Sequence, residues 1–229
     1  MGIWLYFRSD DSQKPLRARE VATRYLAEHL ARTFPKDKVL VVSNPFTLKD
    51  GQPQHIYLFE KAGVKGLRQG LGDTRLKIDY PKLQAGALKN PHEFIIPPEA
   101  TTPVAWLLED EAFSNLQRKH PDCGLMVSLI GMPPGLRKSE FWQDKDSPKL
   151  ALLLPDLWMF GNPTTIASAF KSGRIAAAVL PKPGVSPEDS LKATKDFSSR
   201  FLLVTSENID EMLGEYPQLF EPPELGPRY

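Results

Sequence analysis

Lys38-Val-Leu-Val-Val42 is the stretch of the sequence that decides the fold. It is a short, apolar and mostly β-branched run that stops at Ser43-Asn44-Pro45. A run that is apolar on both faces is typical of a strand buried inside a parallel sheet. Segments with apolar residues at helical spacing flank it, over residues 15–34 and 56–71. A parallel strand between two helices predicts a βαβ unit.

The same alternation continues to the C-terminal end of the chain. Apolar runs of strand length alternate with helical segments, and Pro or Gly marks many of the boundaries. This order predicts a doubly wound α/β fold with a mostly parallel sheet of about six strands and helices on both faces. Pro15 is expected in the first turn of the first helix, and Asn162 is expected to cap another. The remaining predicted strands are 75–80, 125–130, 150–154, 175–180 and 201–205, and the remaining predicted helices are 103–120, 163–172, 187–199 and 208–216.

Proline makes up 22 of the 229 residues, about twice its usual share of ~5%. Most prolines fall between predicted elements, which favours a compact domain over a disordered chain. We expect an N-terminal arm (1–14), a single α/β domain (15–216) and a proline-rich tail (217–229). Ile3-Trp-Leu-Tyr-Phe7 is either an edge strand or the end of a membrane anchor with aromatic residues at the interface. Loop 132–148 is either a lid or an ordinary connection.

Composition and charge exclude several kinds of site. Lys and Arg number 29 and Asp and Glu 28, a net charge of +1 that predicts no nucleic-acid partner. Cys123 is the single cysteine, so it has no partner for a disulfide within the chain, and we expect it to be a small buried residue. The four histidines lack metal-ligand spacing, and no phosphate-binding glycine motif is complete. No metal and no cofactor are therefore predicted.

The candidate binding residues follow the predicted strands. Open parallel sheets bind ligands outside the carboxyl ends of their strands. Ser43, Asn44, Asp79 and Asp156 lie at such ends, although Asp79 could simply form a turn. Trp158 follows Asp156 in an apolar-aromatic run that either covers a helix end or binds a ligand or partner.

Val39-Leu-Val-Val-Ser43-Asn44-Pro45-Phe46 resembles the first strand and turn of the type I periplasmic binding proteins and of LacI-type effector domains. The similarity extends over residues 38–130, through a helix with internal glycines and an Asp before the third strand. It implies a cleft for a sugar or another small ligand, lined by Asn44 and Phe46. Residues 47–55 are an insertion relative to the family. The chain is also too short for two full lobes, so it does not imply the closing of two lobes on a ligand.

Three functions stay open on the sequence. The first is a non-catalytic, periplasmic-binding-like module for a small polar ligand, outside the cytoplasm and tethered to a membrane, with a membrane-associated protein as a possible partner. A cytoplasmic location is the alternative. The second is a protein-interaction domain that uses residues 132–148, 158–160 and the tail. The third is an enzyme with Asp79, Asp156 and Lys182 as acid–base groups; the sequence favours no catalytic residue.

Overall fold

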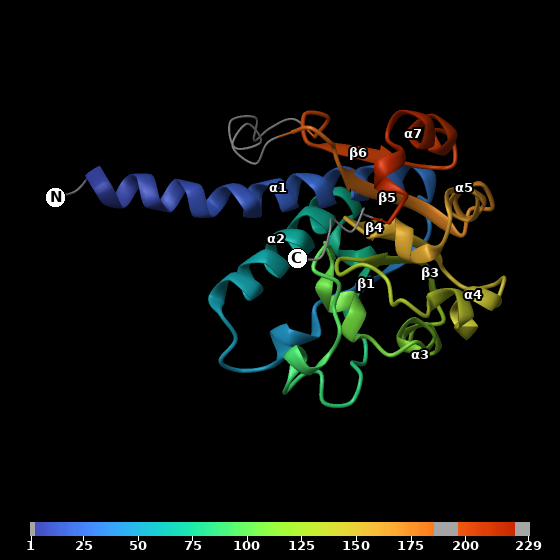
Figure 1. Ribbon diagram of the computed structural model, residues 1–229, viewed down its shortest axis with the longest axis horizontal. Coiled ribbons are helices and arrows are strands. Elements are labelled where there is room, and N and C mark those ends of the chain that lie inside the picture. The colour runs from blue at the N-terminus through green and yellow to red at the C-terminus, as the bar shows by residue number, and fades with distance from the viewer. Residues whose placement is uncertain (1–2, 186–196, 223–229) are drawn as a thin grey trace, which may run out of the picture.

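A six-stranded sheet in the order β2-β1-β3-β4-β5-β6 forms the centre of the molecule (Figure 1). The computed structural model describes residues 3–185 and 197–222. The first five strands in this order are parallel, and β6 runs antiparallel to β5. This confirms the predicted doubly wound, mostly parallel α/β fold. The strands are β1 (Lys38–Val42), β2 (Leu76–Asp79), β3 (Cys123–Ser128), β4 (Lys149–Leu153), β5 (Ile175–Pro181) and β6 (Phe201–Val204).

Helices cover both faces of the sheet because alternate strand residues point to opposite sides. Val39 and Val41 of β1 pack with α1 and α2, whereas Leu40 and Val42 pack with α3, α4, α5 and α7. All four side chains are fully buried. The helices are α1 (Ile3–Thr33), α2 (Gln54–Leu71), α3 (Ala112–Lys119), α4 (Glu140–Gln143), α5 (Pro163–Lys171) and α7 (Ile209–Glu215).

Three glycines of α2 allow unusually close packing against α1. A Cβ at Gly66 would lie 2.9 Å from the backbone nitrogen of Arg24 and closer still to Thr23 Oγ1, and a Cβ at Gly70 would lie 2.5 Å from Ala27 Cβ. Gly63 leaves similar room for the Arg19 side chain, because a Cβ at Gly63 would lie 3.0 Å from Arg19 Nε. Glycine weakens an isolated helix, but here it lets two helices lie side by side on the sheet. This packing determines the position of the Arg19 side chain.

The first helix begins earlier than its proline predicts. α1 starts at Ile3 and contains Pro15, so the edge-strand interpretation of 3–7 is wrong. Proline lacks only its own N–H, and a helix can continue through it with a local distortion. Its 31 residues span about 46 Å, and its N-terminal part extends well beyond the body of the molecule (Figure 1). No helix in the described parts of the chain combines the length and the apolar character that crossing a membrane requires.

Part of the predicted C-terminal tail packs against the domain. Residues 217–222 are not a free tail, because a 3-10 helix at Pro217–Leu219 places Phe220 in the core with no exposed surface. The rest of the predicted tail lies outside the described residues, as does most of the predicted helix 187–199.

A long irregular segment between β2 and α3 caps the carboxyl edge of the sheet. The segment is closed by a bridge between Leu83 and Leu108, and Gln84 Nε2 donates to the carbonyls of Trp106 and Leu108. The predicted helix 103–120 is therefore two pieces, a 3-10 helix at Pro103–Leu107 and α3. The segment carries its own small apolar core, which contains Ala87 and Leu107. It brings residues 101–104 over the ends of the central strands.

Candidate functional site

A cleft of about 310 Å³ lies at the carboxyl edge of the sheet. One wall is α2 with the side chain of Arg19 from α1, and the other wall is the capping segment at 101–104. The turns after β3 and β4 form the floor between them. Its volume is at the lower end of the range typical of small-molecule sites. Fourteen residues line it: Arg19, Asn44, His55, Ile56, Phe59, Glu60, Thr101, Thr102, Pro103, Val104, Leu129, Ile130, Leu153 and Leu154.

Arg19 and Glu60 form a buried ion pair in the first wall. Arg19 NH2 lies 3.4 Å from Glu60 Oε2 and donates at 3.0 Å to the Leu129 carbonyl. The guanidinium also lies 4.4 Å from the ring centre of Phe59. Burial lowers the pKa of Arg19 and Glu60 raises it in part; an arginine stays protonated throughout. Within the described structure its buried Nε, which faces Gly63 of α2, has no hydrogen-bond partner.

Glu60 also ties the turn after β1 to α2. Its Oε1 accepts from the Ser43 hydroxyl and, at 3.0 Å, from the backbone N–H of Asn44. Asn44 Oδ1 in turn accepts from the N–H of Phe46 and caps a 3-10 helix at 45–48. This arrangement leaves the Asn44 amide donors for the cleft, since the described residues offer Nδ2 no partner. Ser43 and Asn44 are therefore brought together, Asn44 on the cleft and Ser43 behind it.

Asp156 holds the second wall in place. Its carboxylate accepts from the backbone N–H and hydroxyl of both Thr101 and Thr102, at 2.7–3.3 Å. Thr101 Oγ1 also lies 3.0 Å from the carbonyl oxygen of Leu154, so its single proton is shared between this carbonyl and Asp156. Asp156 is 5% exposed and lies behind the threonines, so its place in the structure is that of a positioning residue.

The turns under this wall have unusual backbone geometry. Leu154 has φ +47°, a conformation that costs a non-glycine residue about 1–2 kcal/mol. Gly131 has φ +81°, and a Cβ there would lie 2.5 Å from Thr102 Oγ1. Such strain tends to gather at functional sites. Here the positive φ values of Leu154 and Gly131 let the capping segment come close to the ends of β3 and β4.

The other sequence candidates lie apart from the cleft. Phe46 is 9% exposed and packs with Ala87 and Leu107 in the small apolar core of the capping segment. Asp79 ends the edge strand β2, next to β1, and its carboxylate pairs with Lys119 at 2.6 Å and His120 at 2.7 Å. Trp158 packs against Trp106, with ring centres 6.0 Å apart.

Asp79 has an altered acidity. Burial opposes its ionisation, but hydrogen bonds from Lys119, His120 and the Tyr80 N–H outweigh that effect and lower the pKa of the carboxyl. This ion-pair cluster joins β2 to the end of α3, which is a structural arrangement.

The acid–base set proposed from the strand ends is not assembled. Asp79 pairs with α3, Asp156 binds two threonines, and Lys182 Nζ reaches the carbonyl of Ser198. Cys123 is buried, as predicted, and burial raises the pKa of its thiol. Among the residues that the structure describes, no three His, Cys, Asp or Glu side chains are grouped to hold a metal ion.

Sequence reasoning missed most of the cleft. Arg19 and Glu60 each interrupt an apolar stripe, with Ala22 and Leu26 on α1 and with Ile56 and Val64 on α2. A charge inside a buried stripe is the signal that could have found them, because such residues need a partner. Thr101 and Thr102 lie in an irregular segment where no periodic pattern exists.

The chain was also compared with known proteins. No protein-family model matches it, and no curated protein matches it. Among solved structures, a carbohydrate transporter from Acidothermus cellulolyticus in complex with myo-inositol is similar at 13% identity and a TM-score of 0.51, covering 89% of this chain and 62% of that one. An arabinose-binding protein from Geobacillus stearothermophilus is similar at 15% identity and a TM-score of 0.47, covering 84% and 62%.

These chains are longer than this one, which spans about 62% of their length. At such low identity the likeness concerns the fold alone. At the level of the fold it confirms the resemblance stated over residues 38–130: the chain has the fold of the type I periplasmic binding proteins.

Proposed function

We propose that this chain binds a small, neutral, polyhydroxylated ligand in the carboxyl-edge cleft and does not transform it. The observation that carries this proposal is the chemistry of the cleft walls. Donors and acceptors from Arg19, Glu60, Asn44 and Thr102 stand beside the apolar side chain of Ile130. A cleft that is mostly apolar, with a few convergent polar groups, is typical of small-molecule sites.

The charges in the cleft favour a neutral ligand. Arg19 and Glu60 are both more than nine-tenths buried and face each other, so their charges largely cancel. A charged ligand would have to break this pair and leave one buried ion unmatched, which is costly. Hydroxyl groups instead both donate and accept, and can bond the two residues at once. A cyclic polyol, such as the myo-inositol held by the Acidothermus protein, has this character.

Calorimetric titration and thermal shift with myo-inositol, pentoses and hexoses test the proposal. A ligand that binds only the folded chain raises its melting temperature, and 100-fold saturation stabilises by about 2.7 kcal/mol. Asn44→Ser keeps an oxygen for the local cap but removes the amide donors; we expect about tenfold weaker binding. Asn90→Ser, at an exposed loop position, is the matched control and should bind as the wild type does. No binding by any neutral polyol at millimolar concentration would refute the proposal.

We also propose an extracytoplasmic location, with the N-terminal arm as a tether that brings the cleft near a membrane-associated partner. Two features support it: Trp4 and Tyr6 precede Arg8, as at a membrane interface, and α1 carries the arm well beyond the body of the molecule (Figure 1). Fractionation of the native cells tests this idea. Recovery in the membrane fraction, with release when residues 1–14 are deleted, supports the tether; a cytoplasmic protein with or without them contradicts it.

A protein-interaction domain remains the second candidate, although on a different surface from the one the sequence suggested. In two of the segments that the sequence suggested, loop 132–148 and residues 158–160, Phe141 and Phe160 are buried in the core. Leu48, Leu88 and Ile95 around the capping segment are exposed, Ile95 by 94%. Affinity capture with wild type and Leu48→Ser/Ile95→Ser compares the partner sets; identical sets would remove this surface from consideration.

A further inference from the structure

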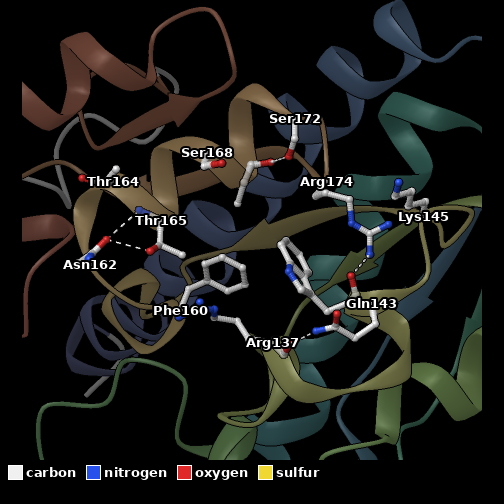
Figure 2. A pocket seen from close by; sticks show the side chains of 12 residues that line it. Arg137, Gln143, Lys145, Phe160, Asn162, Thr164, Thr165, Ser168, Ser172 and Arg174 are labelled. Carbon is white, nitrogen blue, oxygen red and sulfur yellow. Dashed lines mark hydrogen bonds between the residues drawn. The ribbon is translucent and has the colours of Figure 1, made fainter.

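A second hollow, of about 640 Å³, lies between α4 and α5 on the other face of the sheet from Arg19 and α2 (Figure 2). Its lining differs in character from that of the cleft. Three cations line it, Arg137, Lys145 and Arg174, and the lining contains no acidic residue. Trp142 and Phe160 provide aromatic surface.

The three cations lack the acidic partners that neighbouring cations have. Among the ion pairs of the described chain, Lys171 on α5 pairs with Asp210 and Arg118 pairs with Glu140, but none involves Arg137, Lys145 or Arg174.

The acid whose charge acts on Arg174 has its own hydrogen-bond partners. Asp144 directs its carboxylate to Gln117 and Ser147, although its charge still acts on Arg174. Arg174 instead donates to three carbonyls, those of Phe141, Trp142 and Asp144, at 2.7–3.0 Å. These bonds use three of the five N–H groups of a guanidinium and hold the wall in place.

The aromatic rings connect the two cationic ends of the groove. Arg137 lies over Phe160 at 5.7 Å, Phe160 meets Trp142 edge-on at 4.5 Å, and Arg174 lies over Trp142 at 5.0 Å. Figure 2 shows Arg137 and Phe160 at the end near Asn162 and Thr165, and Arg174 with Lys145 at the end near Ser172. Trp142 is only partly buried, so part of its side chain is accessible between the two arginines.

Neutral hydrogen-bonding groups and a helix N-terminus accompany the cations in the groove. Asn162 caps α5, and Thr164, Ser168 and Ser172 present hydroxyls along the groove. The positive end of the nine-residue helix α5 adds to the positive potential near Arg137. A phosphate ester carries nearly two negative charges and several strong acceptors, which suits three unpaired cations better than a single carboxylate does.

We propose that this groove binds a small molecule carrying a phosphate on a sugar or nucleoside ring, at a second site separate from the carboxyl-edge cleft. The phosphate lies against the cations and the ring packs on Trp142. This site does not depend on the polyol site, because the two share no lining residue.

Calorimetric titration at low salt, with ribose 5-phosphate and AMP as probes, tests the site and distinguishes a sugar from a nucleotide. Ribose, adenosine and inorganic phosphate are the comparison arms. We expect at least one phosphorylated ring compound to bind at least tenfold more tightly than its neutral parent and than inorganic phosphate. Raising NaCl should weaken binding, because exposed charges are screened.

Arg137→Gln/Lys145→Gln removes two exposed cations from the groove, and Arg32→Gln/Lys36→Gln removes two exposed cations elsewhere. The first variant should bind at least about tenfold more weakly, as expected for a lost charge-assisted hydrogen bond. The second should stay within twofold, and both should melt near the wild type. No binding of either probe at 5 mM (about the upper limit for a useful site), equal binding of the neutral parents or of inorganic phosphate, or equal loss in both variants would overturn the proposal.

Discussion

Gly66→Ala tests how the helix pair places Arg19 in the cleft. In an ordinary helix, Gly to Ala stabilises by about 1 kcal/mol. Here the added methyl group meets backbone as well as side chain, since the N atom of Arg24 lies only 2.9 Å from the new Cβ and the Glu20 carbonyl lies closer. Backbone cannot rotate away, so α1 and α2 must separate. Overpacking of this kind costs about 1–3 kcal/mol, and we take the upper end.

The net expectation is a loss of about 2 kcal/mol in the free energy of unfolding, from about 3 lost and 1 gained. For a chain of this size the melting temperature should fall by about 4–8 °C. Ligand affinity should fall as well, because Arg19 lies one helical turn from Thr23 on the face that moves.

Gly214→Ala is the matched control, in α7 with nothing within 4 Å of the new Cβ. It should raise the melting temperature slightly or leave it unchanged. Differential scanning calorimetry measures both variants. A Gly66→Ala protein as stable as the wild type would refute the close-packing argument.

Three further predictions concern the cleft wall and the edge cluster. Asp156→Ala removes the acceptor for Thr101 and Thr102, so it should lower the free energy of unfolding by about 2–4 kcal/mol and abolish polyol binding. Urea unfolding and calorimetric titration measure the two effects, and unchanged stability or intact binding would contradict this prediction. Gly131→Ala should cost about 2–4 kcal/mol, from positive φ plus the contact with Thr102, whereas Gly86→Ala at φ +87° in open space should cost only about 1–2; equal losses in thermal melts would contradict the contact. The pKa of Asp79 is lower in the folded chain than its ordinary 3.8, so its contribution to stability is present above that value and is lost as pH falls through the folded pKa. Asp79→Asn should therefore reduce the loss of unfolding free energy at acidic pH, and an unchanged dependence of stability on pH would contradict this prediction.

The sequence predicted the elements whose signals are local. Asn162 and Pro163 cap and open α5, and Asn162 Oδ1 accepts from the Thr165 N–H at 2.8 Å. Residues 39–42 of the valine-rich run are buried on both faces, as their composition indicates. Such signals lie within a few residues of the feature that they determine.

The cleft depends on contacts between distant segments. Arg19 and Glu60 are 41 residues apart, and Thr101 meets Asp156 from 55 residues away. No local pattern encodes these pairs, and the capping segment that carries Thr101 has no period. Asp156 was found because it ends a strand, but its partners show that it supports the wall. The sequence pattern misplaces the start of α1, because a proline usually marks a helix boundary, whereas Pro15 lies inside this helix.

Amide NMR spectra of the full chain, recorded during titration with the tightest-binding neutral polyol, test the central claim most directly. We expect the largest shifts on Asn44, Thr102 and Ile130, which line the carboxyl-edge cleft from three separate segments. The amides of Thr165 and Ser168, in the cationic groove on α5, should stay in place. Shifts centred on α5, or none at the cleft at saturating polyol, would contradict it.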